Sequence, residues 1–456
     1  MNQLIKGVNM ELRRKIYNDL LEWKRTSNGS TAMMLEGARR VGKSYISELF
    51  GQREYKSYLL IDFSNIPAIV KDLFLNESYT LDDFFLKLSI YYSVRFHNRD
   101  TLIIFDEVQL FPAARQLIKH LVADGRYDYL ETGSLISLKR NIQDIVIPSE
   151  EEQIEIHPLD FEEFLEVMGE SFTYEYIRKQ FHDEKHLGEA LHRKAMNLFR
   201  QYILTGGMPQ AVLEFIKTKD FDRVDKVKRR ILKLYRDDVT KFASGYESKV
   251  LNVFDEIPDQ LSKHEKKFRL SDINKSARFR EYENAFTWLS EAKIVNICFN
   301  ATDPNVGLAM NQDRLTLKCY MADTGLLISH AFSENRSTDN EVYKALLFDR
   351  LSVNEGMFME NIVAQMLMRN GHKLYFYSRS DKNNAQNNLE IDFLIRKNRK
   401  ISPIEVKSSG YNRHTSVDKF RSKFKSRIGQ TYIIYTKDYR KEDNITYLPI
   451  YMTMFL

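Results

Sequence analysis

Two alternating patterns of apolar and polar positions run along the first third of the chain. Short apolar runs have the length and composition of buried strands, and between them lie segments with apolar residues at helical spacing. The expected strands are 31–35, 58–63, 101–108 and 127–134, and the expected helices are 10–25, 44–50, 81–90 and 112–122. Strands that alternate with helices predict an α/β domain with a parallel sheet.

The remainder of the chain has a different pattern. Residues 156–244 are helical in spacing, apart from a helix-breaking turn at Thr205-Gly-Gly-Met-Pro209. Residues 247–332 predict three helices followed by two strands, the order of a winged helix. Those helices are 247–263, 268–274 and 279–291, and those strands are 293–298 and 315–321. In the last segment we expect a helix at 356–369 and strands at 373–377, 388–395 and 401–407.

A phosphate-binding motif separates the first expected strand from the helix at 44–50. Its residues are Gly37, Ala38, Arg39, Arg40, Val41, Gly42, Lys43 and Ser44, followed by Tyr45. The spacing G-x-x-x-x-G-K-[ST] is that of a loop whose backbone amides surround nucleotide phosphates. Lys43 reaches the β- and γ-phosphates, and the Ser44 hydroxyl ligates Mg²⁺. A chance match would not explain the strand and helix on either side, so we predict an ATP and Mg²⁺ site.

Two carboxylates end the strand expected at 101–108. Asp106 is placed to hold the hydrated Mg²⁺, and Glu107 to orient and polarise the attacking water. A strand that ends in solvated acids is the structural alternative. The position of this pair, about one βαβ unit after the phosphate loop, favours the functional interpretation.

Several further residues are candidates with an equal or better structural alternative. Thr132 or Ser134 is a candidate sensor of the γ-phosphate, or else caps the next helix. Arg236 is a candidate to complete a neighbouring subunit's ATP site, although an ordinary surface arginine is the better default. Arg278 and Arg280 begin the third helix of the expected winged helix, which in such modules enters a DNA major groove or contacts only proteins.

A second constellation lies near the C-terminus. Asp392, Glu405 and Lys407 match Asp…Glu-x-Lys, the pattern of metal-dependent nucleases with restriction-type folds. Glu405 and Lys407 are two apart on one strand and therefore point to one face. Two carboxylates suit Mg²⁺, and Glu360 on the preceding helix is a candidate third ligand. A hairpin with solvated charges is the alternative, because E-x-K alone is a weak motif.

Composition limits the class of protein. A chain of 456 residues is long enough for several domains, and 43% hydrophobic with 29% charged residues is typical of a soluble protein. There is no apolar run of membrane-spanning length and no secretion signal, and the two cysteines form no framework, so we expect a cytoplasmic protein. The net charge of +5 is uneven: residues 396–443 hold 14 Lys and Arg against 5 Asp and Glu, a local +9. Such a bias attracts phosphate backbones, although many charge runs are only solvated faces.

Eight motifs in order resemble a known family. They are GARRVGKS, IIFDEVQ, LETGSLIS, PLDFEEFL, LTGGMPQAV, PDQLSK, YMADTGLL and FMENIVAQMLMRNGHKLYFY. Together they are similar to prokaryotic AAA-type ATPases with a C-terminal domain of unknown function that is restriction-endonuclease-like. Many relatives look like GPRQVGKT, whereas this chain has Ala38, Arg40 and Ser44 there; serine and threonine both supply the magnesium-binding hydroxyl. The resemblance covers nearly the whole chain and implies architecture more than cellular role.

The expected fold is therefore α/β with four segments. They are a P-loop ATPase core of the AAA type (1–155), a helical lid (156–246), a winged helix (247–332) and a restriction-endonuclease-like, PD-(D/E)xK-like α/β domain (333–456). One hypothesis is an ATPase that controls a Mg²⁺-dependent nuclease acting on nucleic acid, with DNA as the expected partner. The other is a nucleotide-controlled switch whose C-terminal domain only binds DNA or a protein. The sequence leaves open a monomer, a dimer and a larger homo-oligomer.

Overall fold

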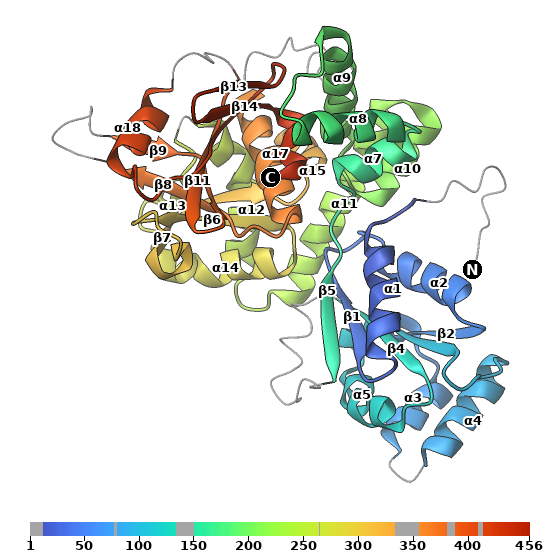
Figure 1. Ribbon diagram of the computed structural model, residues 1–456. Coiled ribbons are helices and arrows are strands. Elements are labelled where there is room, and N and C mark those ends of the chain that lie inside the picture. The colour runs from blue at the N-terminus through green and yellow to red at the C-terminus, as the bar shows by residue number, and fades with distance from the viewer. Residues whose placement is uncertain are drawn as a thin grey trace. The chain divides into compact units, whose positions relative to one another are not determined.

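The structure is a computed structural model, and it describes residues 12–76, 80–133, 150–263, 265–332, 355–380, 388–408 and 414–456. The chain divides into two compact units (Figure 1). The first unit is Met1–Gly37 with Val41–Glu170, and the second is Ala38–Arg40 with Ser171–Leu456. The first unit thus extends past the boundary expected at 155, and the three later segments of the prediction group together. Their separate roles stay a prediction.

The first unit is built on a parallel five-stranded sheet in the order β2-β3-β4-β1-β5. Its strands are β1 (Ala32–Glu36), β2 (Ser57–Asp62), β3 (Thr101–Asp106), β4 (Asp128–Gly133) and β5 (Glu151–Glu155). Its helices are α1 (Ile16–Ser27), α2 (Lys43–Glu54), α3 (Ala68–Leu75), α4 (Leu81–Tyr92), α5 (Pro112–Asp124) and α7 (Phe161–Val167). The sequence predicted all but β5, which is rich in glutamate, and α3.

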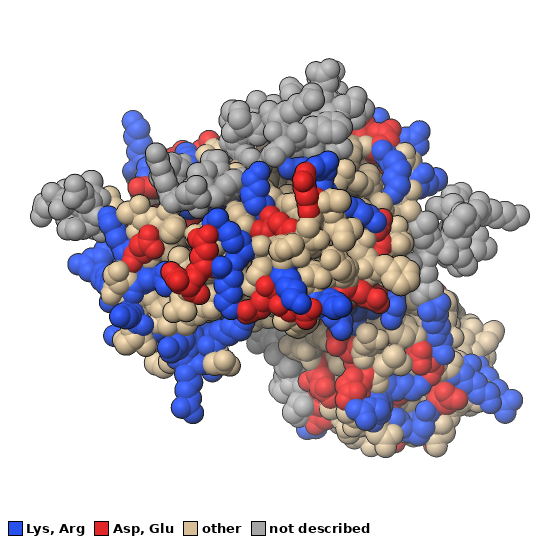
Figure 2. All heavy atoms as spheres, turned by 45° about the horizontal axis from the view of Figure 1, so that its top comes forward, with Lys and Arg blue, Asp and Glu red and all other residues tan. Residues whose placement is uncertain are grey.

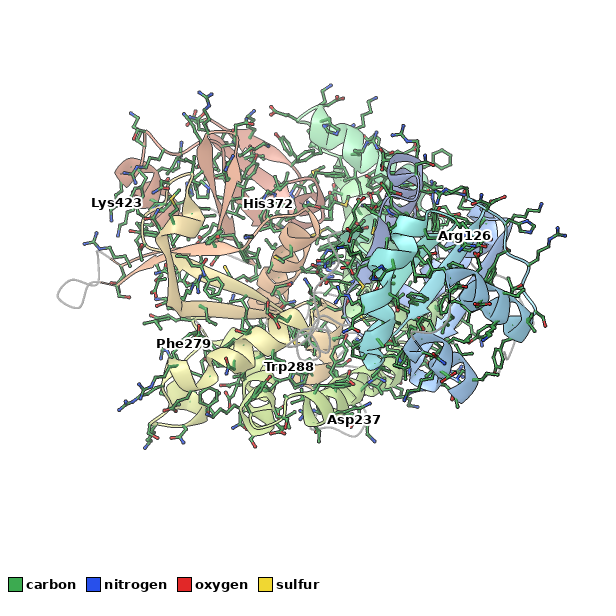
Figure 3. The ribbon with its side chains drawn as sticks, turned by 90° about the horizontal axis from the view of Figure 1, so that it is seen from below. Arg126, Asp237, Phe279, Trp288, His372 and Lys423 are labelled. Atoms are coloured by element: carbon green, nitrogen blue, oxygen red, sulfur yellow. The ribbon has the colours of Figure 1, made fainter. Side chains whose placement is uncertain are left out.

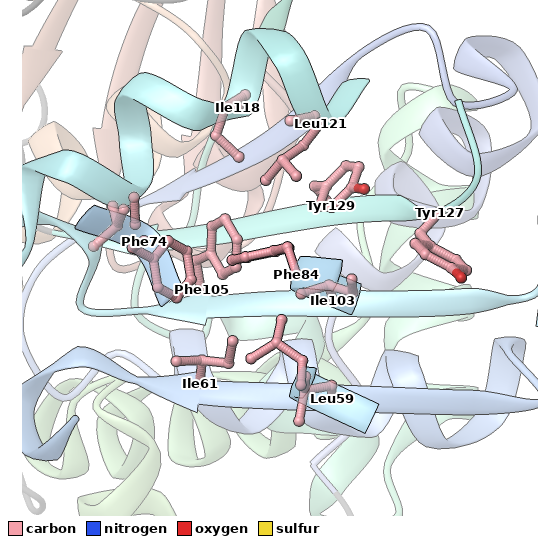
Figure 4. Close-up of a cluster of buried hydrophobic side chains, with 14 of the residues drawn as sticks. Leu59, Ile61, Phe74, Phe84, Ile103, Phe105, Ile118, Leu121, Tyr127 and Tyr129 are labelled. Carbon is pink, nitrogen blue, oxygen red and sulfur yellow. The ribbon is translucent and has the colours of Figure 1, made fainter. Parts of the chain in front are cut away.

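The two faces of this sheet pack against different helices. Successive residues of a strand point to opposite faces, so each strand contributes to both packing layers. On one face, Ile103 and Phe105 of β3 join a cluster with α3, α4 and α5 (Figure 4). On the other face, Leu102 and Ile104 join a cluster with α1 and α2, which includes Trp23. A strand that is buried on both faces reads as a continuous apolar run, which is why β3 was recognisable in the sequence.

The second unit begins with helices and ends with two sheets. Its helices are α8 (Ser171–His182), α9 (Glu189–Thr205), α10 (Pro209–Thr218), α11 (Phe221–Phe242), α12 (Glu247–Ser262), α13 (Leu270–Ile273), α14 (Phe279–Glu291), α15 (Thr324–Ala331), α17 (Glu355–Arg369) and α18 (Thr415–Lys423). Figure 3 labels Phe279 and Trp288 on α14, and Trp288 is buried there. Among the residues described, no helix has the length and apolar composition needed to span a membrane.

The two sheets of this unit meet at Asp392. One sheet has the order β7-β6-β8-β9 and the other β10-β11-β12-β14-β13. The strands are β6 (Val295–Ala301), β7 (Gln312–Met321), β8 (Tyr375–Arg379), β9 (Leu389–Ile391), β10 (Phe393–Lys397), β11 (Lys400–Val406), β12 (Thr431–Tyr435), β13 (Arg440–Glu442) and β14 (Ile445–Pro449). The single strand expected at 388–395 is thus two strands, broken at Asp392, each of which pairs in a different sheet.

The hairpin expected as a wing is present but is not a separate wing. Strands β6 and β7 pair antiparallel after α12, α13 and α14, as the winged-helix pattern predicts. However, β6 also pairs in parallel with β8, so the hairpin is continuous with a sheet of the last segment. This pairing was not predictable from the sequence, because β6 and β8 are far apart along the chain.

Two of the recognised motifs, LTGGMPQAV and YMADTGLL, pack directly against each other. Asp323 is buried, and its carboxylate accepts the amide of Gly207 at 2.6 Å and that of Leu326 at 2.8 Å. A Cβ on Gly206, which has φ +77°, would lie 2.4 Å from Oδ1 of Asp323. A Cβ on Gly325 would lie 2.5 Å from the Cα of Gly206. These glycines therefore allow the α9–α10 turn to contact the start of α15.

We predict that Gly206→Ala destabilises the second unit by about 3 kcal/mol or more, because a left-handed residue costs about 1–2 kcal/mol and the contact with Asp323 adds overpacking. Gly245→Ala is the matched control, since Gly245 has φ +88° with nothing within 4 Å of the added Cβ. Urea unfolding, followed by Trp288 fluorescence in a Trp23→Phe background, measures the free energy of unfolding of both variants. Equal losses in the two variants would contradict the close approach.

Candidate functional site

The phosphate-binding motif lies between β1 and α2, as expected. The strand ends at Glu36, and the helix begins at Lys43. A Cβ on Gly37 would lie 2.3 Å from the carbonyl oxygen of Ile156, and Gly42 has φ +100°, so both positions require glycine. The loop residue Arg40 is left-handed too, with φ +69°.

Lys43 is buried at the first position of α2. Its Nζ donates to the carbonyl oxygen of Gly37 at 3.0 Å, so the side chain turns back over the loop. Unpaired amide groups and the helix dipole at the start of a helix attract anions, and Lys43 adds a full positive charge there. Of the other loop residues, Ala38 and Val41 are buried, while Arg39, Arg40 and Tyr45 are exposed.

Three of the predicted site residues meet at the Asp106 carboxylate. Its Oδ1 accepts the hydroxyl of Ser44 at 2.7 Å and the hydroxyl of Thr132 at 2.5 Å. Thr132 also accepts the amide of Glu107 at 3.1 Å. Burial raises the pKa of Asp106, and the hydrogen bonds from Thr132 and Ser44 oppose that rise. The strand order explains the meeting, because β4 lies between β1 and β3.

Glu107 follows β3 in a left-handed conformation, with φ +55°. Its carboxylate accepts the side-chain amide of Gln109, a contact that the sequence did not suggest. The Gln109 side chain is itself held close to the sheet, since a Cβ on Gly133 would lie 2.6 Å from its Oε1. Gln109 therefore limits the orientations that Glu107 can take.

The donor set around Asp106 fits a magnesium ion. A serine hydroxyl and a carboxylate are hard oxygen ligands, which Mg²⁺ prefers, and the 2.7 Å contact places them side by side. Ser44 and Asp106 would hold the ion, whose positive charge would offset charge on the phosphates. Ser134 lies outside the described residues.

Arg14 supports the phosphate-binding loop from the N-terminal side. It is buried, and its guanidinium donates to the carbonyl oxygen of Val41 at 3.1 Å, to that of His157 at 2.6 Å and to Oε1 of Glu163 at 3.2 Å. Glu163 also accepts the amide of Lys15 at 2.7 Å, and with Asp160 it forms a capping box at the start of α7. Nothing in the sequence indicates the contact of Arg14 with the loop.

The Asp…Glu-x-Lys residues of the second unit also lie together. Phe393 pairs with Ile404 across the β10–β11 hairpin, which brings Asp392 beside Glu405. Asp392 accepts the amide of Val406 at 2.9 Å, and Lys407 donates to Oε1 of Glu405 at 2.8 Å. Burial, reinforced by the Asp392 carboxylate, raises the pKa of Glu405 to about 8, although Lys407 acts in the opposite direction.

Glu360, the expected third ligand, faces lysines. Its carboxylate accepts Lys318 at 3.1 Å, and it also accepts Lys266 and the hydroxyl of Tyr320. Burial alone would raise the pKa of Glu360, but Lys266 and Lys318 outweigh burial and lower it to about 2. Over the described part of the chain, no group of three or more His, Cys, Asp or Glu side chains is arranged to hold a metal ion. The geometry does not support Glu360 as a metal ligand.

The sequence did not single out Lys266 or Lys318. Lys318 alternates with the buried residues Leu317 and Cys319 in β7, so a half-exposed hairpin would place it in solvent. Instead α17 contacts β7, and Lys318 is only 1% exposed. Arg236, in contrast, is paired within the chain: its guanidinium donates to both carboxylate oxygens of Asp255.

Family comparisons cover three stretches of the chain. Residues 29–165 match an AAA domain, residues 196–337 a domain of unknown function (DUF8612), and residues 355–453 another domain of unknown function (DUF4143). The first unit is therefore of the AAA type, with the P-loop fold that the sheet order and loop display. Each match covers less than half of the chain. No curated protein matches.

Solved structures resemble the chain only loosely. A Walker-type ATPase of Pyrococcus abyssi has 14% identity and a TM-score of 0.42, over 70% of this chain and 96% of that one. The Aeropyrum pernix Orc1 protein in complex with DNA has 11% identity and a TM-score of 0.30, over 74% and 96%. AMPPCP-bound DnaA from Aquifex aeolicus has 14% identity and a TM-score of 0.30, over 62% and 88%. These TM-scores are too low to support an argument about this chain.

We predict that Arg14→Met lowers the free energy of unfolding of the first unit by about 3–5 kcal/mol, because it leaves the Glu163 charge buried without its partner. The matched control is Arg13→Met, since Arg13 is 78% exposed and only 3.6 Å from Glu166; the expected loss is below about 1 kcal/mol. Trp23 fluorescence in a Trp288→Phe background follows the unfolding. A small loss in Arg14→Met would contradict the supporting role.

Proposed function

We propose that the first unit binds ATP with Mg²⁺ and hydrolyses it. The observation that carries the proposal is the meeting of Ser44, Asp106 and Thr132 at one carboxylate, directly beside the phosphate-binding loop. The amides of residues 37–45 surround the phosphates, Lys43 neutralises their charge, and Ser44 with Asp106 holds the cation. An AAA-type domain over residues 29–165 agrees with this assignment.

In this proposal Glu107 is the general base and Thr132 is a sensor. The carboxylate of Glu107 polarises the water that attacks the γ-phosphate, and Gln109 holds that carboxylate. Thr132 contacts both Asp106 and the amide of Glu107, so its hydroxyl connects the residue that holds the cation with the residue that acts on water. A change at either one alters the hydrogen bonding of the other.

The second unit, we infer, acts on nucleic acid, with DNA as the expected partner. Arg278 and Arg280 are exposed at the start of α14, where a winged helix contacts DNA. Helix α18 lies within the basic segment 396–443. Arg421, Lys425 and Asn444 line a surface hollow of about 320 Å³. Lys and Arg side chains gather on the left of Figure 2, on the side where Figure 1 has α18. Lys423 of α18 is labelled in Figure 3.

Cleavage by the second unit is a second candidate function. The approach of Asp392, Glu405 and Lys407 to one another favours it. The lysines around Glu360 oppose it, because they neutralise carboxylates that a nuclease uses for metal ions. Binding without cleavage is therefore the function that we favour for this unit. Assembly into a homo-oligomer stays a prediction.

Two substitutions separate ATP binding from turnover. We expect Lys43→Ala to abolish binding of a fluorescent ATP analogue, because the phosphates lose their buried cation. We expect Glu107→Gln to bind the analogue normally but to release inorganic phosphate at least about 100-fold more slowly, because an amide is not a base. Exposed Lys119→Ala and Glu22→Gln are the controls. Unchanged turnover in Glu107→Gln would refute the assigned role.

A gel assay with labelled double-stranded DNA tests the role of the second unit. With Mg²⁺ or Mn²⁺ and ATP, we expect the protein to retard the DNA without cutting it, and Arg278→Ala with Arg280→Ala to weaken the retardation. Cleavage that Asp392→Ala and Lys407→Ala abolish, while ATP hydrolysis persists, would establish the second candidate. No retardation at low salt would remove DNA as the partner.

A further inference from the structure

Lys318 is buried among three carboxylates in the second unit. Its Nζ is 3.1 Å from Oε1 of Glu360, 3.0 Å from Oε1 of Glu390 and 3.6 Å from Oδ1 of Asp392. Only 1% of its side chain is exposed. An ammonium group has three N–H donors, so three carboxylate neighbours can all be satisfied by this one side chain.

A second lysine completes the charge balance. Lys266 forms an ion pair with Oε2 of Glu360 and donates to the carbonyl oxygen of Gly356 at 3.2 Å. Both oxygens of Glu360 are thus bonded to ammonium groups, and Tyr320 donates a further hydrogen bond to Oε1. A buried carboxylate with these partners has little capacity left for a metal ion.

The carboxylates and the lysines come from different segments of the chain. Glu360 lies on α17, Glu390 on β9 and Asp392 between β9 and β10, within the segment expected to be nuclease-like. Lys318 lies on β7 and Lys266 precedes α13, within the segment expected to be a winged helix. The cluster therefore joins the two segments through opposite charges, in addition to the pairing of β6 with β8.

We propose that Lys318, with Lys266, is the built-in cation of this cluster and that the site holds no divalent metal while Lys318 is present. The inference is independent of the ATPase proposal. A divalent ion between Asp392 and Glu360 would have to occupy the space next to the Lys318 ammonium, where like charges repel. The carboxylates thereby have lysine ammonium groups, and no metal ion, as their positive partners.

One buried oxygen remains without a hydrogen bond in the cluster. Oε2 of Glu405 has no partner among the described residues, although Oε1 is paired with Lys407. Asp392 lies beside Glu405, forms an ion pair with Lys318 at 3.6 Å and accepts the amide of Val406. Removing the Lys318 charge would leave the Asp392 and Glu405 carboxylates without that ammonium, and a hard cation would then replace it.

Counting bound Mn²⁺ by electron paramagnetic resonance tests the proposal. The experiment uses the full chain without nucleotide. The signal of free Mn²⁺ disappears on binding, so the loss of signal gives the number of bound ions. We expect the wild-type protein, Asp392→Asn and Glu405→Gln to bind the same number of ions. We expect Lys318→Met to bind one ion more, and the double variant Lys318→Met with Asp392→Asn to lose that ion. Lys318→Arg, which keeps the charge, should behave as the wild type.

Two results would overturn the proposal. The first is a wild-type Mn²⁺ ion that Asp392→Asn or Glu405→Gln removes, since the site would then hold a metal beside Lys318. The second is a folded Lys318→Met protein that gains no ion, since the lysine would then not be what excludes it. Trp288 fluorescence reports whether Lys318→Met is folded, and if it is not, the comparison of the wild type with the two carboxylate variants decides.

Discussion

The Asp106 carboxylate is the group on which the first unit's site depends. It is a single buried acceptor that bonds Ser44 from the start of α2 and Thr132 from the end of β4. Such a carboxylate is stable in a buried position only when hydrogen bonds or a cation compensate for lost hydration. The parallel sheet order supplies those partners, because it aligns the carboxyl ends of β1, β4 and β3 next to one another.

The second unit also contains buried carboxylate groups, but lysine side chains compensate for their charge. Its acidic residues match the pattern of a metal-dependent nuclease, yet their compensating charge comes from Lys266 and Lys318 within the chain. A buried ammonium cannot polarise a phosphodiester as Mg²⁺ does. It can, however, hold carboxylates from separate segments of the chain close to one another. A sequence pattern for ligands therefore does not establish a metal site until the surrounding cations are known.

The local parts of both sites were predictable from the sequence. The phosphate loop, Asp106, Glu107 and the pair Glu405 and Lys407 lie within short stretches in which spacing determines geometry. Contacts between distant residues were not: Arg14 bonds Glu163, and Lys318 bonds Glu360, through pairings that no periodicity encodes. The break at Asp392 was also missed, because a strand that changes sheets keeps the same alternation of apolar residues on both sides.

The contact of Arg14 with the Val41 carbonyl oxygen has a mechanical consequence. The same guanidinium holds Glu163 at the start of α7, and α7 ends at Val167, shortly before the second unit begins at Ser171. The planar, rigid guanidinium of Arg14 thus joins the backbone of the phosphate-binding loop to the start of α7. A displacement of the loop that keeps these bonds has to carry the start of α7 with it, so the covalent connection into the second unit begins at an element that moves with the phosphate-binding loop.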